Sequence, residues 1–205
     1  MVNSEQVVGI LHAIGDKIIE QKLYLSELDN VIGDGDHGIN LARGFLAVQQ
    51  KEPAMQGKDV GTIFKTVGMA LVSTVGGASG PLYGTAFMQA GKEMAGKTEI
   101  GPDDLLTILN AAIAGVQLRG KAVAGEKTML DAMIPARDAL AANLPLGAKG
   151  ALAAAVQAAR DGVAYTKTII ATKGRASYLG ERSLGHQDPG ATSFTMMLEV
   201  AADAV

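Results

Sequence analysis

Apolar residues recur every three or four positions along most of this chain, and this spacing restricts the fold more than any other feature. Such a repeat is typical of an amphipathic helix. In the first segment it is formed by Val7, Val8, Leu11, Ile14, Ile18 and Ile19. The same criterion predicts further helices at about 38–50, 59–75, 81–95, 103–121, 128–142, 148–173 and 190–204. Because no run of strands with alternating polarity separates these segments, we predict an all-α fold.

Composition supports a globular chain with closely packed helices. Hydrophobic residues make up 48% of the 205 residues and charged residues 19%, a balance that excludes a disordered chain. The sequence holds 26 glycines, and Ala-rich stretches such as 151–159 favour helix formation. No Ser/Pro-rich or charge-block linker interrupts the chain, so we expect one domain over 1–205.

The connections between the predicted helices carry the unusual polar residues. They lie at 29–38, 76–80, 120–128 and 173–190, after the first, third, fifth and seventh predicted helices. In an up-and-down bundle, alternate connections fall at the same end. The sequence therefore predicts that these four connections meet at one site.

Three carboxylates crowd the first of these connections. Asp34 and Asp36 are two positions apart, whereas neighbours on a helix face are three or four apart, so they and Asp29 converge only through an irregular loop. The intervening glycines permit such a loop. Carboxylates about 6 Å apart repel by roughly 3 kcal/mol, and a divalent cation bound between them makes the electrostatic energy of the cluster favourable. Oxygen ligands without cysteine indicate Mg²⁺, Ca²⁺ or Mn²⁺ rather than zinc.

The alternative for the same stretch is a solvated acidic turn before a helix, where carboxylates are favoured. An EF-hand is a poor match, because Ile39 and Phe45 stand where its loop needs glycine and glutamate. Mg²⁺ usually completes its coordination with water and substrate phosphates. If this stretch binds Mg²⁺, the other connections should therefore carry phosphate-binding features.

Each of the other connections has donors suited to a phosphate. Residues 76–81 (GGASGP) place glycines before Pro81, which suits the first position of a helix whose N-terminus attracts anions. Residues 173–182 concentrate Lys, Arg and hydroxyl donors, and Asp188 with Pro189 indicates a helix start. The loop 119–131 also enters a helix. None is a Walker A or Gly-x-Gly-x-x-Gly fingerprint, and helix packing or surface ion pairs remain the alternative at each.

Several classes of function are disfavoured by the sequence. The net charge is −3 and no basic stripe with interleaved aromatics is present, so we expect no nucleic-acid partner. The absence of cysteine excludes disulfides and thiol catalysis. Without a signal-peptide pattern or an apolar run of about 18 residues, we expect no membrane association and a cytoplasmic location.

Four segments together closely resemble one known family. The segments are GDGDHGIN, GGASGPLYG, GEKTMLD and KGRASYLGERSLGHQDPGATS, and they resemble, in the same order, the nucleotide-binding subunit of dihydroxyacetone kinase. The resemblance extends through essentially all 205 residues. It implies a closed barrel of eight antiparallel helices with the nucleotide, ADP or ATP, held at one end.

The resemblance also implies roles for individual residues. Asp29, Asp34 and Asp36 would hold two Mg²⁺ ions that bridge the nucleotide phosphates. The phosphate side would be lined by His37, Gly38, Ile39 and Asn40 and capped by Ala78, Ser79 and Gly80. Gly120, Thr128 and Met129 would lie by the adenine and ribose, while Arg175, Asp188, Pro189 and Gly190 would close the pocket. No catalytic residue is assigned, His12 is expected to be structural, and the role of His186 is open.

A kinase of this family needs a partner subunit that holds dihydroxyacetone. In one variant ATP is an exchangeable substrate; in the other, ADP stays bound and is rephosphorylated by a phosphocarrier protein of the sugar phosphotransferase system. The free-standing length favours the second variant. Alternatives are a kinase subunit for a related small ketose or sugar acid, a non-catalytic nucleotide sensor, and a divalent-metal phosphate-ester hydrolase. A homodimer is a further expectation.

Overall fold

Helices account for nearly all the regular structure in the computed structural model, which describes residues 1–205. The all-α prediction is confirmed. The longer helices are α1 (Ser4–Glu20), α2 (Lys22–Ile32), α3 (His37–Gln49), α5 (Val60–Thr74), α6 (Ser79–Glu93), α7 (Pro102–Gly120), α8 (Leu130–Asn143), α9 (Gly147–Thr166) and α10 (Pro189–Asp203). The smaller elements are α4 (Glu52–Met55), the 3₁₀ segments η1 (Leu144–Leu146) and η2 (Arg175–Ser183), and the strands β1 (Val2–Asn3) and β2 (Glu99–Ile100).

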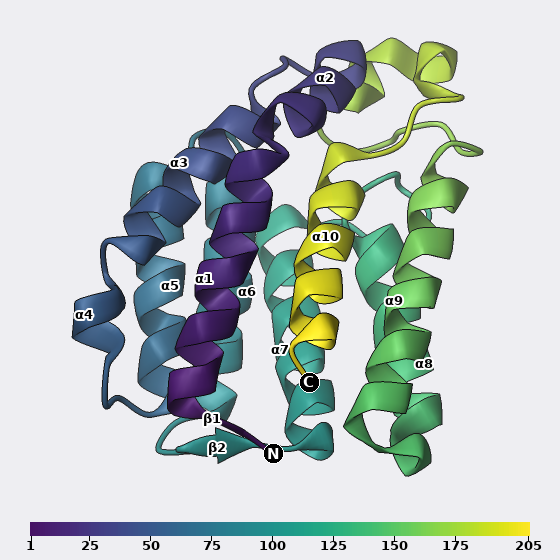
Figure 1. Cartoon of the computed structure of the whole chain (residues 1–205). Coiled ribbons are helices and arrows are strands. Elements are labelled where there is room, and N and C mark those ends of the chain that lie inside the picture. Colours follow the sequence, from purple (N-terminus) through teal and green to yellow (C-terminus); the bar gives the residue numbers. More distant parts are fainter.

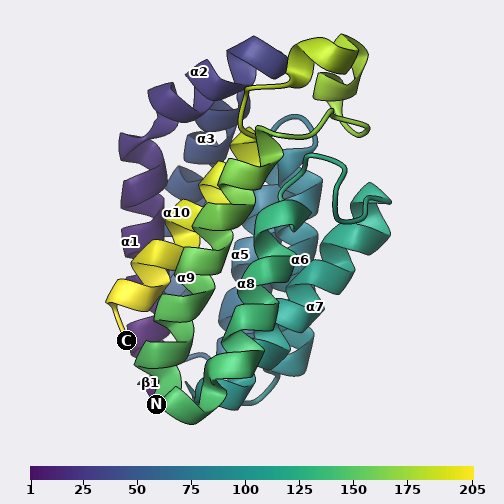
Figure 2. The same ribbon diagram turned by 90° about the vertical axis from the view of Figure 1, so that its right-hand side faces the viewer.

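Eight of the helices run side by side around a common core (Figure 1, Figure 2). Helices α1, α3, α5, α6, α7, α8, α9 and α10 each contact the next in this order, and α10 returns to contact α1. Helix α2 and η2 lie together over one end of this ring (Figure 1). At the other end β1 pairs antiparallel with β2, with Val2 opposite Ile100. The ring therefore has two different ends.

The core lies inside the ring. Forty buried hydrophobic residues form one cluster to which all eight ring helices contribute. The predicted first stripe faces this core, since Leu11, Ile14 and Ile18 are buried. The interior also contains a cavity of about 210 Å³ lined only by hydrophobic side chains, including Phe64 and Phe87, whose rings meet edge to face.

Small residues let neighbouring helices approach closely, as the composition suggested. A Cβ atom on Gly162 of α9 would come within 2.1 Å of the backbone oxygen of Asp131 in the adjoining α8 region. A Cβ on Gly68 of α5 would come within 2.7 Å of the backbone oxygen of Gly84 in α6. No larger residue fits these contacts without movement of the backbone.

The structure differs from the predicted helices in three places. Helix α2 was not predicted, because it is short and buries only Leu25, Ser26 and Ile32. Helix α6 begins at Ser79, two residues before Pro81, with Ala78 at the cap position. Helix α9 ends at Thr166 rather than near 173, because the β-branched run that follows favours helix poorly and its carbonyls accept hydrogen bonds elsewhere.

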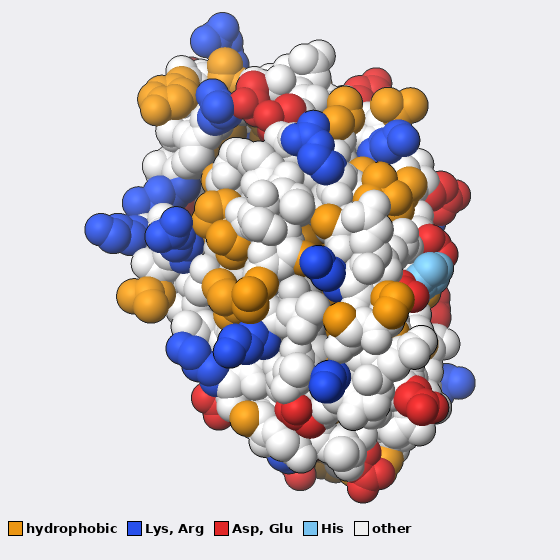
Figure 3. Space-filling view, turned by 90° about the vertical axis from the view of Figure 1, so that its left-hand side faces the viewer, with side chains coloured by type: hydrophobic (Ala, Val, Ile, Leu, Met, Phe, Trp, Pro, Cys, Tyr) orange, Lys and Arg blue, Asp and Glu red, His pale blue; other side chains and the backbone are white.

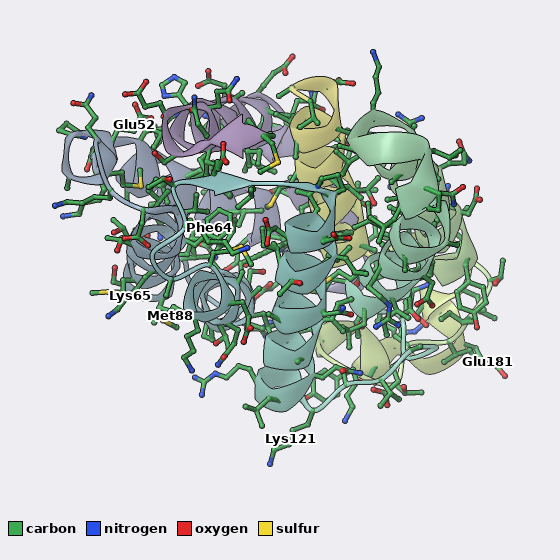
Figure 4. All side chains as sticks on the ribbon, turned by 90° about the horizontal axis from the view of Figure 1, so that it is seen from below. Glu52, Phe64, Lys65, Met88, Lys121 and Glu181 are labelled. Carbon is green, nitrogen blue, oxygen red and sulfur yellow. The ribbon has the colours of Figure 1, made fainter.

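Two further features concern α4 and the pair of helices α8 and α9. Helix α4 packs beside α1, where Glu52 accepts a 2.5 Å hydrogen bond from His12 Nδ1 (Figure 4). The stretch Leu130–Thr166 is long and apolar enough to cross a membrane by length and composition alone. The structure divides it into α8 and α9, which pack against each other and contribute to the core.

Candidate functional site

A polar hollow opens at the end of the ring that α2 and η2 cover. Its lining comes from all four connections that the helix alternation predicted to meet. The contributing stretches are 29–37, 76–79, 127–129, and 173–176 together with 188–190. Predicted site residues in this lining are Asp29, Asp34, Asp36, His37, Ala78, Ser79, Thr128, Met129, Arg175, Asp188, Pro189 and Gly190.

The three aspartates of the first connection converge at the hollow. One oxygen each of Asp29, Asp34 and Asp36 lies within 4.8 Å of the others. The chain reaches this geometry because Gly35 adopts φ 76°, in the left-handed region. An all-oxygen cluster of this kind fits Mg²⁺, Ca²⁺ or Mn²⁺.

Asp29 also determines how α3 begins. Its Oδ2 accepts hydrogen bonds from the backbone N–H of Asp36 (3.0 Å) and of His37 (3.1 Å), so a residue from α2 caps the first turn of α3. Burial raises the pKa of the Asp29 carboxyl, and the two backbone hydrogen bonds partly oppose that rise. The Asp36 side chain makes no capping bond. Its carboxylate is therefore available to a cation.

Arg175 reaches the acidic cluster from η2. Its Nε lies 2.8 Å from Oδ2 of Asp34, and both side chains are partly exposed. An arginine next to carboxylates at the opening of the hollow supplies a fork-shaped donor for a phosphate. This contact joins the fourth connection to the first.

The second connection presents the N-terminus of α6 to the hollow. Gly77 has φ 66°, a conformation that lets the chain turn sharply into the helix. Ala78 and Ser79 follow and line the hollow. The unpaired N–H groups of a helix start favour an anion there.

His37 is buried and hydrogen-bonded on both sides of its ring. Nδ1 lies 2.9 Å from Oγ of Ser79, and Nε2 lies 3.0 Å from Oγ of Ser193. The Ser193 hydroxyl lies 2.7 Å from the Tyr83 hydroxyl. Burial lowers the pKa of His37 to about 4, so its ring is neutral at pH 7.

The third connection is held by a buried lysine that the sequence reading did not single out. Lys127 is 1% exposed, and its Nζ donates to the carbonyls of Thr166 (2.5 Å), Ile169 (3.3 Å) and His186 (2.6 Å). Burial lowers its pKa. These bonds connect the end of α9 and the segment before α10 to the loop that carries Thr128. The backbone carbonyl is the only part of His186 with a contact in this network.

Asp188 begins α10 as predicted. Its Oδ2 accepts a 2.6 Å hydrogen bond from the Ala191 N–H, and Pro189 occupies the first turn. Burial raises the pKa of Asp188 to about 7, and the hydrogen bond from Ala191 opposes that rise. The carboxyl and the following Gly190 both line the hollow.

Five predicted site residues do not line the hollow. They are Gly38, Ile39, Asn40, Gly80 and Gly120. A Cβ on Gly38 would come within 1.9 Å of the Lys22 carbonyl oxygen, and one on Gly80 within 2.3 Å of the Val75 carbonyl oxygen, so both glycines permit close packing. Ile39 is 47% exposed on the outer side of α3. Gly38 and Gly80 therefore lie in helix contacts, and Ile39 lies on the surface.

Sequence reasoning missed Tyr83, Lys127 and Ser193. Tyr83 and Ser193 stand four and three residues after Ser79 and Gly190, at a spacing that places them one turn into α6 and α10. That spacing was the available signal for them. Lys127 has φ 62°, an uncommon left-handed conformation for a non-glycine residue. Nothing in its sequence pattern distinguished it from a surface lysine.

The fold and the hollow together define an all-α protein with a cluster of three carboxylates and two helix N-termini at one end of a ring. The chain belongs to the DAK2 domain family, which it matches over residues 31–203.

Relatives of nearly equal length support this membership. The chain is 45% identical to the "PEP-dependent dihydroxyacetone kinase, ADP-binding subunit DhaL" of Escherichia coli (strain K12), with 96% of this chain and 95% of the relative covered. It is 42% identical to the "PTS-dependent dihydroxyacetone kinase, ADP-binding subunit DhaL" of Lactococcus lactis, with both chains fully covered at 100%.

A solved structure has the same fold. The dihydroxyacetone kinase of C. freundii in complex with AMP-PNP and Mg²⁺ superposes with a TM-score of 0.75 at 27% identity. The match covers 97% of this chain and 34% of that chain, so this protein spans about a third of the solved kinase.

Proposed function

We propose that this chain is the nucleotide- and Mg²⁺-binding subunit of a dihydroxyacetone kinase. It would transfer a phosphoryl group from the bound nucleotide to dihydroxyacetone held on a separate subunit. The observation that carries the proposal is the convergence of Asp29, Asp34 and Asp36 within 4.8 Å, beside the N-terminus of α6. Phosphoryl transfer depends on positioning and charge neutralisation, which such a site supplies.

The donor set fits Mg²⁺, and we propose that the three aspartates hold two ions. When bound, Mg²⁺ would neutralise charge on the nucleotide phosphates. The Ser79 hydroxyl and the first N–H groups of α6 would donate to phosphate oxygens. Arg175 would provide a further cationic donor from η2. His37 would orient Ser79 and remain neutral.

We propose that the remaining lining holds the nucleoside. Thr128 and Met129 would lie by the adenine and ribose, with Gly120 farther along the same connection. Asp188, Pro189 and Gly190 would close the pocket opposite them. Gly38, Ile39, Asn40 and Gly80 would act through the backbone, because their side-chain positions lie outside the lining.

Bound ADP that is rephosphorylated by a phosphocarrier is the favoured variant of this function. The relatives that match end to end are named as ADP-binding subunits of PEP- or PTS-dependent kinases. The solved kinase that carries AMP-PNP is about three times longer. An ATP-dependent subunit for dihydroxyacetone or another small ketose or sugar acid is the second candidate.

The rim of the hollow supports docking of a substrate-holding subunit. Exposed apolar side chains lie on the elements that cover this end of the ring, with Val31 at the end of α2 48% exposed, Tyr178 in η2 86% exposed and Leu184 just after η2 42% exposed. A phosphoryl donor and its acceptor must meet without intervening water. The apolar rim would exclude water once the partner is seated.

We propose a single domain and a cytoplasmic location for the chain, with no nucleic-acid partner. On the face over α3, α4 and α5, apolar patches are interspersed with both basic and acidic side chains (Figure 3). A mixed surface of this kind is unlike a nucleic-acid footprint. Self-association as a homodimer is a separate proposal that the oligomeric mass in solution tests.

Reconstitution distinguishes this function from its rivals. The purified chain is stripped of any nucleotide, which is identified, and is then supplied with either ATP or a phosphorylated carrier, with and without a dihydroxyacetone-binding subunit. A kinase subunit forms dihydroxyacetone phosphate only with that partner. A hydrolase releases phosphate alone, and a sensor binds nucleotide without transfer under every condition.

The metal assignment is tested by removing one carboxylate. Asp34→Ala should abolish Mg²⁺-dependent retention of ADP, and treatment of the wild-type chain with a chelator should do the same. Asp103→Ala is the matched control, because this exposed carboxylate opens α7 near β2, at the opposite end of the ring. Equal ADP retention by the two variants would contradict the assignment.

A further inference from the structure

The partly buried Ser79 and three buried polar side chains form a continuous series of hydrogen-bonded groups that begins at the polar hollow. Ser79 Oγ lies 2.9 Å from His37 Nδ1, His37 Nε2 lies 3.0 Å from Ser193 Oγ, and Ser193 Oγ lies 2.7 Å from the Tyr83 hydroxyl. The Gly190 carbonyl oxygen lies 3.1 Å from Ser193 Oγ and 3.2 Å from the Tyr83 hydroxyl, within reach of either hydroxyl proton. Of the four side chains, Ser79 and His37 line the hollow and Ser193 and Tyr83 do not.

The number of available protons allows hydrogen-bond donation between these four side chains to run in either of two directions. A neutral imidazole has one N–H donor and one acceptor nitrogen, and each hydroxyl has one proton to donate. If Nε2 carries the ring proton, it donates to Ser193, and Nδ1 must accept the Ser79 proton. The Ser79 hydroxyl then presents only lone pairs to the hollow.

In the opposite direction every donor points toward the hollow. Tyr83 donates to Ser193, Ser193 donates to His37 Nε2, and His37 Nδ1–H donates to Ser79 Oγ, so neither hydroxyl proton goes to the Gly190 carbonyl. The Ser79 proton is then free for a ligand. A phosphate oxygen accepts hydrogen bonds, so only this second direction lets Ser79 contribute to an anion.

We propose that Tyr83 and Ser193 are positioning residues that act through His37 to orient the Ser79 hydroxyl proton toward a phosphate in the hollow. This inference rests on the proposed function. Ser193 is fully buried and Tyr83 is 3% exposed, so water does not replace either group. Each ring nitrogen of His37 is paired with a hydroxyl, so these four groups respond to an anion by choice of the His37 tautomer.

The tautomer can be observed directly. The protein has three histidines. Nitrogen-15 labelling of histidine gives signals for all three, and the His12→Gln and His186→Gln variants show which signals belong to His37. With Mg²⁺ and ADP added to the wild-type chain, we expect Nδ1 protonated and Nε2 non-protonated. An Nε2–H tautomer in the nucleotide-bound chain would overturn the inference.

A double-mutant cycle tests whether the inner residues act through Ser79. By calorimetry with Mg²⁺ and ADP, Ser79→Ala should weaken binding about tenfold to a hundredfold, the value of one donor to a charged group. Ser193→Ala or Tyr83→Phe should weaken it about threefold to tenfold. In the Ser79→Ala background these second changes should have no further effect, whereas a merely structural role gives additive losses.

Thr195→Val is the matched control for a lost buried hydroxyl on α10, because Thr195 bonds only to the Ala191 carbonyl within its helix. It should leave both affinity and tautomer unchanged. If Ser193→Ala fails to fold, the binding cycle with Tyr83→Phe and the His37 tautomer of the wild-type protein still test the inference. Failure of the wild-type chain to bind ADP overturns the proposed function, whereas binding with additive losses overturns only this inference.

Discussion

At the scale of single residues, the site depends on side chains whose partners are distant in sequence. Asp29 caps α3 from α2, and Lys127 binds carbonyls 39 to 59 residues away. Each such residue both connects distant segments through hydrogen bonds and lines the hollow. Substitutions at these positions should therefore affect stability as well as binding.

Lys127→Met should destabilise the protein by about 2–4 kcal/mol, because it leaves buried carbonyl acceptors without a donor. Chemical denaturation followed by circular dichroism measures the change. The control is Lys149→Met on α9, an exposed lysine, which should change the free energy of unfolding by less than about 0.5 kcal/mol. Equal stability of the two variants would show that the Lys127 contacts contribute nothing net.

At the scale of elements, packing between adjacent helices depends on glycine. Gly162→Ala places a Cβ against the backbone of α8, 2.1 Å from the Asp131 oxygen and 2.8 Å from the Ala132 Cα. We expect a loss of about 1–3 kcal/mol from overpacking, although alanine favours helix. Urea unfolding measures it.

Gly9→Ala on α1 should change the stability in the opposite direction from Gly162→Ala. Nothing lies within 4 Å of a Cβ at that position. The substitution should therefore stabilise by about 0.5–1 kcal/mol through helix propensity alone. If both alanines shift stability in the same direction, close α8–α9 packing is not the cause of the Gly162 effect.

The contact between α1 and α4 should be sensitive to pH. A hydrogen bond from His12 to Glu52 raises the pKa of His12 above its usual 6.5. A raised folded-state pKa means that this stabilisation is fully present below pH 6.5 and is lost as the pH rises through the folded value.

We therefore expect the stability difference between wild type and Glu52→Gln to be larger at pH 5.5 than at pH 9. Denaturation at the two pH values measures it. The burial of His37 acts in both proteins and cancels in the comparison. A difference that does not change with pH would show that the ion pair contributes no stability.

At the scale of the whole molecule, one core joins all eight ring helices. Its forty residues range from Val2 to Met197, and the last ring helix contacts the first. A shared core of this kind favours cooperative unfolding.

We expect a single unfolding transition, with coincident curves from far-ultraviolet circular dichroism and tyrosine fluorescence, since the chain has four tyrosines and no tryptophan. This experiment also tests the single-domain prediction. Two separated transitions would contradict it.

The sequence by itself determined the helical class and the approximate extent of most helices, because amphipathic periodicity is a local property. It also identified the acidic loop and the helix start at Asp188, because capping depends on neighbouring residues. The alternation of connections was sufficient to predict that four loops share one end. The identity of the ligand as a nucleotide came from the family resemblance, because helical periodicity carries no information about a ligand.

Only the tertiary structure decided which residues of those loops face the hollow. Gly38 and Gly80 belong to helix contacts rather than the lining, and Lys127, Tyr83 and Ser193 gained their roles from partners on other helices. The end of α9 was missed for the same reason, because the carbonyls of Thr166 and Ile169 accept hydrogen bonds from Lys127, which is remote in sequence. Local patterns determine where a helix forms, whereas hydrogen bonds between distant segments determine what each side chain does.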